Sequence, residues 1–233
     1  MSHLSAASLR SIALALMAGA SLLAHTSVQA VALTEPVSPA NFANTTLPGT
    51  TVALRPELAG TVLEDVITPF SFQGITGTVQ NRVVREDATG TLDFIWKVDV
   101  DSVSTGTTGV VALRLINFGY DAIKDADWHI DGLGTVAPVT ARLFNEAAYP
   151  LGAINFLFDG SVDAGAQSRF FFLRTDATSY SQSAFYDLLG GAGQDPSPTF
   201  STFAPAPVPE PQTYALALSG LIVAGLVARR RAA

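Results

Sequence analysis

Cysteine is absent from the 233 residues of the chain, and histidine is scarce, with only 3. Without cysteine there is no disulfide, thiolate metal site, iron–sulfur cluster or cysteine nucleophile. His3 and His25 lie within the first 30 residues, so the rest of the chain contains only His129. A single histidine excludes the multi-histidine sites typical of zinc. A Ser-His-Asp triad needs only one, but no Gly-x-Ser-x-Gly turn is present to expose a serine.

Charge is also scarce, because Asp, Glu, Lys and Arg make up 14% of the chain and the mean hydropathy is +0.33. These values exclude a highly charged disordered chain. Four of the 13 basic residues are Arg10 and the run Arg229–Arg231, so residues 11–228 contain nine basic and twenty acidic residues. Nucleic-acid binding depends on Lys and Arg neutralising phosphates. The acidic balance therefore predicts no nucleic-acid partner.

The first 30 residues have the three parts of a secretory signal peptide. Arg10 supplies the positive charge, Ser11–Leu23 is apolar or small, and small residues follow. Two cleavage points fit, after Val28-Gln29-Ala30 or after Ala30-Val31-Ala32. The order of these parts predicts export, while the alternative is a buried N-terminal helix.

The C-terminus has a second tripartite pattern. Pro209-Glu210-Pro211 precedes the uncharged run Tyr214–Ala228, and Arg229, Arg230 and Arg231 follow. As a helix, this run would be about 22 Å long at about 1.5 Å per residue, which is short for a hydrocarbon core of about 30 Å. Three arginines favour the cytoplasmic side. The pattern thus predicts a short membrane-inserted signal, and the alternative interpretations are a plain membrane anchor and a terminal core helix.

This C-terminal pattern resembles the PEP-CTERM sorting signal of Gram-negative bacteria that make exopolysaccharide. The resemblance covers about 26 residues, from Val208 onward. It implies recognition by an exosortase-like membrane processing enzyme and removal of the tail near Pro209-Glu210-Pro211. Proteins with this signal have diverse bodies, so the resemblance does not indicate what the body of this chain does.

Between the two ends the sequence predicts β structure. Leu92, Phe94, Trp96, Val98 and Val100 alternate with mostly polar residues, which is the period of a half-buried strand. Val110–Phe118 follows a Ser/Thr/Gly loop, so we expect the two to form a hairpin. Tyr180–Leu189 is interpreted as a short helix. The other expected strands are Thr61–Ile67, Ile75–Arg85, Val139–Phe144, Ile154–Phe158 and Ser168–Thr175.

Seven to nine strands with short polar connections predict an all-β fold. We expect an antiparallel, jelly-roll-like β-sandwich with apolar helical segments at both termini. The expected organisation is a signal peptide (1–30), the β-sandwich body (31–190), a Gly/Pro-rich linker (191–207) and the sorting signal with its short transmembrane helix (208–233). Within the linker, Phe200 and Phe203 suggest a last edge strand.

The densest group of carboxylates is Asp121, Asp125, Asp127 and Asp131. Their spacing suggests a calcium loop, because calcium prefers several oxygen ligands on one short segment. The EF-hand pattern fails, with Ile130 and Val136 at positions that require Gly and Glu. We prefer a solvated acidic loop, and we give Asp99 and Asp101 the same interpretation.

Sugar chemistry or sugar binding would use paired carboxylates or exposed aromatic rings. Glu86 and Asp87 are interpreted as turn residues. Trp96 is expected in the core because it alternates with core residues, and Trp128 and Tyr120 are the candidates for stacking on sugars. His129 is expected in a partly exposed loop or strand.

From these observations we expect an exported, non-enzymatic protein of the cell envelope or extracellular matrix, with transient or permanent C-terminal anchoring in the inner membrane. The sequence assigns no catalytic, cofactor or metal residue. Expected partners are the exosortase-like enzyme, the membrane before processing, and exopolysaccharide or other envelope components. The alternatives are a secreted hydrolase acting on matrix polysaccharide and a calcium-stabilised adhesive module.

Overall fold

The computed structural model of the protein describes residues 31–36, 42–145 and 153–206. The expected signal peptide, both apolar terminal segments and the sorting motif Pro209-Glu210-Pro211 with Arg229–Arg231 lie outside these ranges. Within the described ranges, no helix is long and apolar enough to cross a membrane. Apart from the 3₁₀ turn η1 (Pro56–Leu58), the regular structure in them consists of β-strands.

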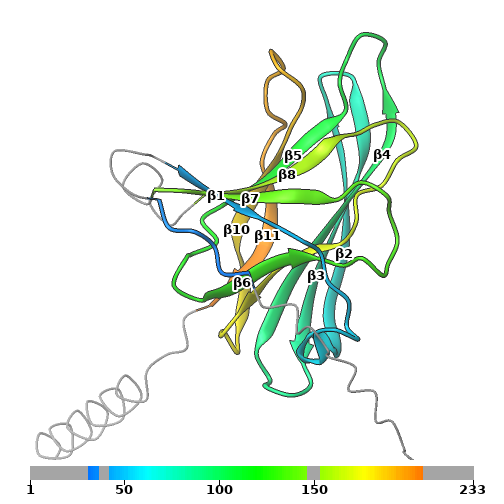
Figure 1. Ribbon diagram of the computed structural model, residues 1–233. Helices are drawn as coiled ribbons and strands as arrows, with labels where there is room; N and C mark the ends of the chain where they lie inside the picture. Colours follow the sequence, from blue (N-terminus) through cyan, green and yellow to red (C-terminus); the bar gives the residue numbers. More distant parts are fainter. Residues whose placement is uncertain (1–30, 37–41, 146–152, 207–233) are drawn as a thin grey trace, which may run out of the picture.

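The strands form two antiparallel sheets (Figure 1). The six-stranded sheet has the order β1-β7-β8-β5-β10-β11. Its members are β1 (Phe42–Thr46), β5 (Val110–Ile116), β7 (Pro138–Phe144), β8 (Ala153–Val162), β10 (Tyr180–Leu189) and β11 (Phe200–Pro205). The five-stranded sheet has the order β2-β3-β4-β9-β6. Its members are β2 (Gly60–Phe72), β3 (Ile75–Glu86), β4 (Leu92–Val103), β6 (Ile123–Trp128) and β9 (Phe171–Thr175).

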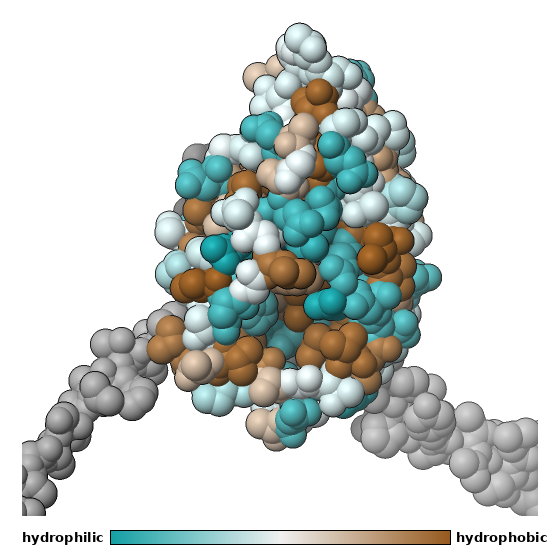
Figure 2. Space-filling model, turned by 90° about the vertical axis from the view of Figure 1, so that its right-hand side faces the viewer, coloured by the Kyte–Doolittle hydropathy of each residue, from teal (hydrophilic) through white to brown (hydrophobic). Residues whose placement is uncertain are grey.

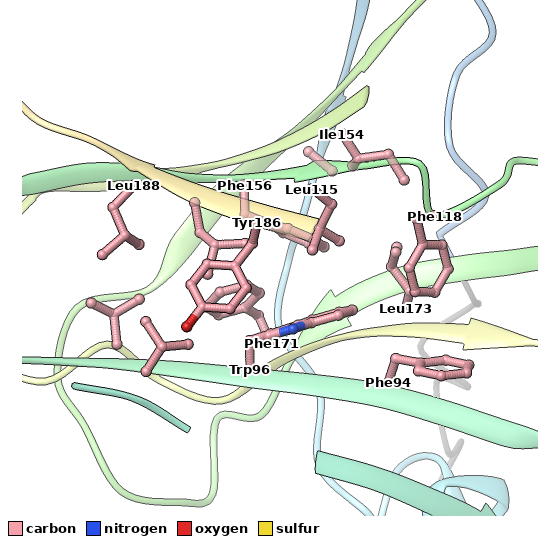
Figure 3. Close-up of a cluster of buried hydrophobic side chains, with 14 of the residues drawn as sticks. Phe94, Trp96, Leu115, Phe118, Ile154, Phe156, Phe171, Leu173, Tyr186 and Leu188 are labelled. Atoms are coloured by element: carbon pink, nitrogen blue, oxygen red, sulfur yellow. The ribbon is translucent and has the colours of Figure 1, made fainter. Parts of the chain in front are cut away.

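The core lies between the two sheets and is centred on Trp96 of β4. Its indole ring is fully buried and stacks on Phe171 of β9, 6.2 Å between centroids. The ring centroid of Phe156, from β8 of the opposite sheet, lies 6.4 Å from that of the indole and 4.7 Å from that of Phe171. Figure 3 shows Trp96 and Phe94 facing Phe156, Leu115 and Tyr186 across this core. The prediction that Trp96 is a core residue is therefore confirmed.

Side chains that are opposite each other in the strand register share a face of the sheet. Leu173 is opposite both Phe94 and Ala126, and all three face the core. Arg174 is opposite both Asp93 and Asp125, so these three lie together on the outer face of the five-stranded sheet. The alternation that predicted half-buried strands thus also places charged groups on one outer surface.

The expected hairpin between Leu92–Val100 and Val110–Phe118 is wrong. Both segments are strands, but β4 pairs with β3 and β9, whereas β5 pairs with β8 and β10. The Ser/Thr/Gly connection crosses from one sheet to the other. Alternating hydrophobicity shows which face a strand buries but does not specify its neighbour.

The expected short helix Tyr180–Leu189 is also wrong, because this segment is strand β10 between β5 and β11. Its inward positions Ala184, Tyr186 and Leu188 are buried and alternate with outward positions. The run contains no β-branched residue, but Tyr180, Phe185 and Tyr186 favour strands, and the sequence interpretation gave them too little weight. The edge strand suggested by Phe200 and Phe203 is confirmed as β11, within the expected 191–207 linker.

Candidate functional site

Residues 47–59, which we call the strap, wrap around the edge of β6. The strap begins on the six-stranded sheet, where the backbone N–H of Leu47 donates to the carbonyl of Val139 over 2.9 Å. It then follows β6, since Thr50 donates to the carbonyl of Trp128 and accepts from the N–H of Ile130. It ends over the outer face of the five-stranded sheet, where Arg55 contacts Asp125.

A close approach at Gly49 fixes the path of the strap. Gly49 has a φ of +81°, a conformation that favours glycine. A Cβ at this position would lie 2.4 Å from the Trp128 ring. The N–H of Gly49 donates to Oδ1 of the buried Asp127 over 2.8 Å, and the N–H of Trp128 donates to the same oxygen. Burial raises the pKa of Asp127 against the opposing effect of these hydrogen bonds.

Beneath the strap lies a cluster of buried charges. Arg55 is 1% exposed, and its guanidinium forms an ion pair with the fully buried Asp125, Nη1 to Oδ1 over 2.9 Å. Nη2 of Arg55 donates to Oδ2 of Asp125 over 3.1 Å, and its Nε donates to Glu57 over 2.9 Å. The same guanidinium lies 5.8 Å from the Phe172 ring. Arg55 thus joins the strap to β6 and β9.

The second arginine of the cluster, Arg174 on β9, joins three strands. It forms an ion pair with Glu86 of β3, and its Nη1 lies 3.5 Å from Oδ2 of Asp125 on β6. Glu86 is buried and also accepts hydrogen bonds from Thr89 and Thr91. Burial opposes ionisation of Glu86, but the bonds from Arg174 and the two threonines outweigh it and lower its pKa. Glu86 therefore carries its charge at neutral pH.

Asp93 of β4 lies on the same outer face and differs from its neighbours in protonation. It is 1% exposed, and burial, followed by the negative charge of Glu86, raises its pKa to about 8. At neutral pH Asp93 is therefore mostly protonated next to an ionised carboxylate. Two carboxyl groups with pKa values moved apart are the pattern of an acid–base pair. Both are buried beneath neighbouring groups, so substrate access would require the cluster to open.

The protonation of Asp93 makes stability depend on pH. Between its unfolded pKa of about 3.9 and its folded pKa of about 8, the folded protein binds the extra proton, so stability falls as pH rises through this window. The Asp93→Asn variant should lose this dependence. Between pH 5 and pH 9, we expect the free energy of unfolding of the variant to rise relative to that of wild type by on the order of 2–4 kcal/mol. Urea denaturation at several pH values measures this gain, and parallel curves for the two proteins would contradict the protonated state.

The preferred interpretation of Asp121–Asp131 as a solvated acidic loop is wrong for its two central members. Asp125 and Asp127 lie on β6 and are buried, because an arginine and backbone N–H groups replace their water. Asp121 and Asp131 are exposed. In the described part of the chain, no group of three His, Asp or Glu side chains is arranged to bind a metal ion. Glu86, interpreted as a turn residue, is instead a buried end of β3.

The aromatic candidates for sugar stacking are held by the fold. The Trp128 indole is half-buried, donates to the carbonyl of Leu47 over 3.2 Å and lies against Gly49. His129 packs on Phe172, 5.1 Å between ring centroids, and burial lowers its pKa. Tyr120 donates its hydroxyl proton to the carbonyl of Phe144 and accepts from the N–H of Ala153.

Tyr120 nevertheless borders two surface cavities. One is about 440 Å³, and the other is about 220 Å³. The larger is lined by Phe118, Asp121, Asp176, Thr178 and the end of β11. The smaller is lined by Leu33, Ile123, Lys124 and Leu143. These cavities, with an aromatic ring and carboxylates at the rim, have the composition of a shallow binding surface.

The charged cluster, which consists of Arg55, Glu57, Glu86, Asp93, Asp125 and Arg174, is separate from the two cavities. The cluster contains paired charges that hold the strap against the sheet, whereas the cavities are open to solvent. The sequence suggested Asp125 and Asp127 but not the partners that hold them, which are Arg55 and Arg174 for Asp125 and the N–H of Gly49 for Asp127. Comparison of the chain with protein-family models, curated proteins and solved structures found no match.

Proposed function

We propose that this chain is an exported protein of the cell envelope or extracellular matrix, sorted by its C-terminal Pro-Glu-Pro signal. Its body is a non-catalytic, jelly-roll-like β-sandwich that interacts with exopolysaccharide or other envelope components. The observation that carries the proposal is the order of signals in the sequence. The N-terminus has a positive charge, then an apolar run, then small residues. The C-terminus has Pro209-Glu210-Pro211, then an apolar run, then Arg229–Arg231.

The described body is stabilised without disulfides. Extracellular domains often use disulfides, and this chain contains no cysteine. The core between the sheets and the paired charges under the strap provide cross-links without thiol chemistry. The face shown in Figure 2 interleaves hydrophobic and hydrophilic patches, as expected for a water-exposed surface.

The end of β11 limits how far the proposed sorting motif can lie from the body. Thr202 of β11 is fully buried, and its hydroxyl oxygen accepts hydrogen bonds from Trp96 Nε1 over 3.0 Å and from Asn81 Nδ2 over 2.6 Å. The strand ends at Pro205. Four residue steps then reach Pro209, at most about 14 Å when extended. The enzyme that reads the motif would therefore work close to the folded body.

A secreted hydrolase is the second candidate, and one observation favours it. The protonated Asp93 beside the ionised Glu86 has the charge pattern of a general acid with its partner carboxylate. Their burial disfavours this candidate, because a polysaccharide would have to displace Arg174 and the strap to reach them. Measurable hydrolysis of matrix polysaccharide that Glu86→Gln abolishes would favour the hydrolase.

The sorting proposal predicts that the substitution Glu210→Ala blocks processing. In a host with the processing enzyme, wild type should lose about 2 kDa, the share of the 24.3 kDa chain that follows Pro211. The variant should stay full-length in the membrane, although the apolar run Tyr214–Ala228 is unchanged. An epitope at the exposed Ala192–Gly193 turn allows blotting of membrane and medium.

The matched control is Gln212→Ala, which alters the residue next to the tripeptide and should be processed like wild type. Full-length membrane retention of wild type and both variants would instead indicate a plain C-terminal anchor. Processing of all three would show that Glu210 is not read.

A further inference from the structure

Residues 31–36, which we call the N-terminal segment, join the edges of both sheets. The carbonyl oxygen of Val31 accepts a hydrogen bond from the backbone N–H of Ala126 over 3.0 Å. The backbone N–H of Thr34 donates to Oγ1 of Thr45 over 2.7 Å, and this Oγ1 lies 3.1 Å from the Thr34 hydroxyl. Ala126 belongs to the edge strand β6 and Thr45 to the edge strand β1.

Two side chains of the segment pack against the core. Val31 and Leu33 are partly buried there, whereas Ala32 between them is exposed. Leu33 lines the smaller cavity together with Tyr120, Ile123 and Leu143. The first described residue of the chain is thus part of the fold through its backbone and its side chain.

These contacts distinguish the two cleavage points that the sequence leaves open. Cleavage after Ala32 would remove Val31 with its packing on the core and leave the N–H of the fully buried Ala126 without this acceptor. A buried N–H that loses its acceptor is unfavourable. Cleavage after Ala30 keeps both the hydrogen bond and the packing.

We propose that the signal peptide is removed between Ala30 and Val31, and that the N-terminal segment remains docked on β6 as part of the mature fold. This inference rests on the proposed export of the chain. The segment also has a protective role, because an unpaired edge strand can pair with another chain. Val31 and Thr50 of the strap engage the edge of β6 at Ala126 and Trp128, and Thr50 also binds Ile130 just beyond the end of the strand.

The substitution Ala32→Asp separates the two cleavage points. Signal cleavage needs a small residue directly before the cut. Ala32 has that position only if the cut precedes Leu33, so the variant should still be cleaved if the cut precedes Val31. We expect the exported wild type and the Ala32→Asp variant both to begin at Val31, as determined by mass spectrometry of the N-terminal peptide.

Ala30→Asp is the matched control, since the same substitution two residues earlier alters both possible sites and should leave the precursor uncleaved. A wild-type chain that begins at Leu33, with cleavage blocked by Ala32→Asp, would overturn the inference and leave the proposed export intact. A wild-type chain that retains Met1 would refute the export itself.

A second measurement tests the docking of the segment in the processed protein. Leu33→Asp places a carboxylate in the packed position and should lower Tm by several degrees, whereas the exposed Ala32→Asp should leave Tm near wild type. Both proteins should still begin at Val31, because neither substitution changes a residue before the cut. Equal Tm values for the two variants would show that the segment is not docked.

Discussion

Replacing Arg55 by Met is expected to lower the free energy of unfolding by about 3–5 kcal/mol, the usual cost of removing one partner of a buried ion pair. Arg55 is 1% exposed, and its partner Asp125 is fully buried. Methionine fills much of the same space, so the loss comes mainly from the uncompensated carboxylate. Arg174 reaches Asp125 only at 3.5 Å and is already paired with Glu86. Urea denaturation followed by circular dichroism measures the change.

The matched control is Lys124→Met, which removes one partner of a surface ion pair. Lys124 lies 2.8 Å from Asp176, and both side chains are about half exposed. Exposed pairs contribute about 0–1 kcal/mol because water solvates the separated charges. A loss from Arg55→Met no larger than that from Lys124→Met would show that the strap is not held by a buried charge.

Strand positions could be predicted from the sequence more reliably than strand partners. The alternation from Leu92 to Val100 correctly gave β4 and its core face. It could not show that β9, about 70 residues later, would lie between β4 and β6. Such pairing depends on how the sheets pack together, and a periodic pattern contains no information on that.

The charged cluster was only partly visible in the sequence for a related reason. Asp125 and Asp127 are two residues apart, so the sequence indicates them as a group. Their burial, however, depends on Arg55, Gly49 and Arg174, which are distant along the chain. One signal could have helped. The alternation in β6 puts Ala126 and Trp128 on the core face and both aspartates on the other. Buried carboxylates on one face of a strand require cationic or N–H partners.

The second large effect is expected for Trp96→Ala, which should lower the free energy of unfolding by about 3–5 kcal/mol. The indole is fully buried and packs on Phe171, Phe156 and Phe118. Its removal leaves a cavity between the two sheets that these rings cannot fill without leaving their own positions. Thermal and urea denaturation of the variant measure the loss.

Trp96→Phe separates the packing of the indole from its hydrogen bond. It keeps an aromatic ring in the core but removes the donor to Thr202, whose hydroxyl still accepts from Asn81. We expect a smaller loss, about 1–2 kcal/mol. The remaining tryptophan, Trp128, then reports unfolding by fluorescence at the β6 edge. If Trp96→Ala cost less than about 1 kcal/mol, the indole would not be the centre of the core.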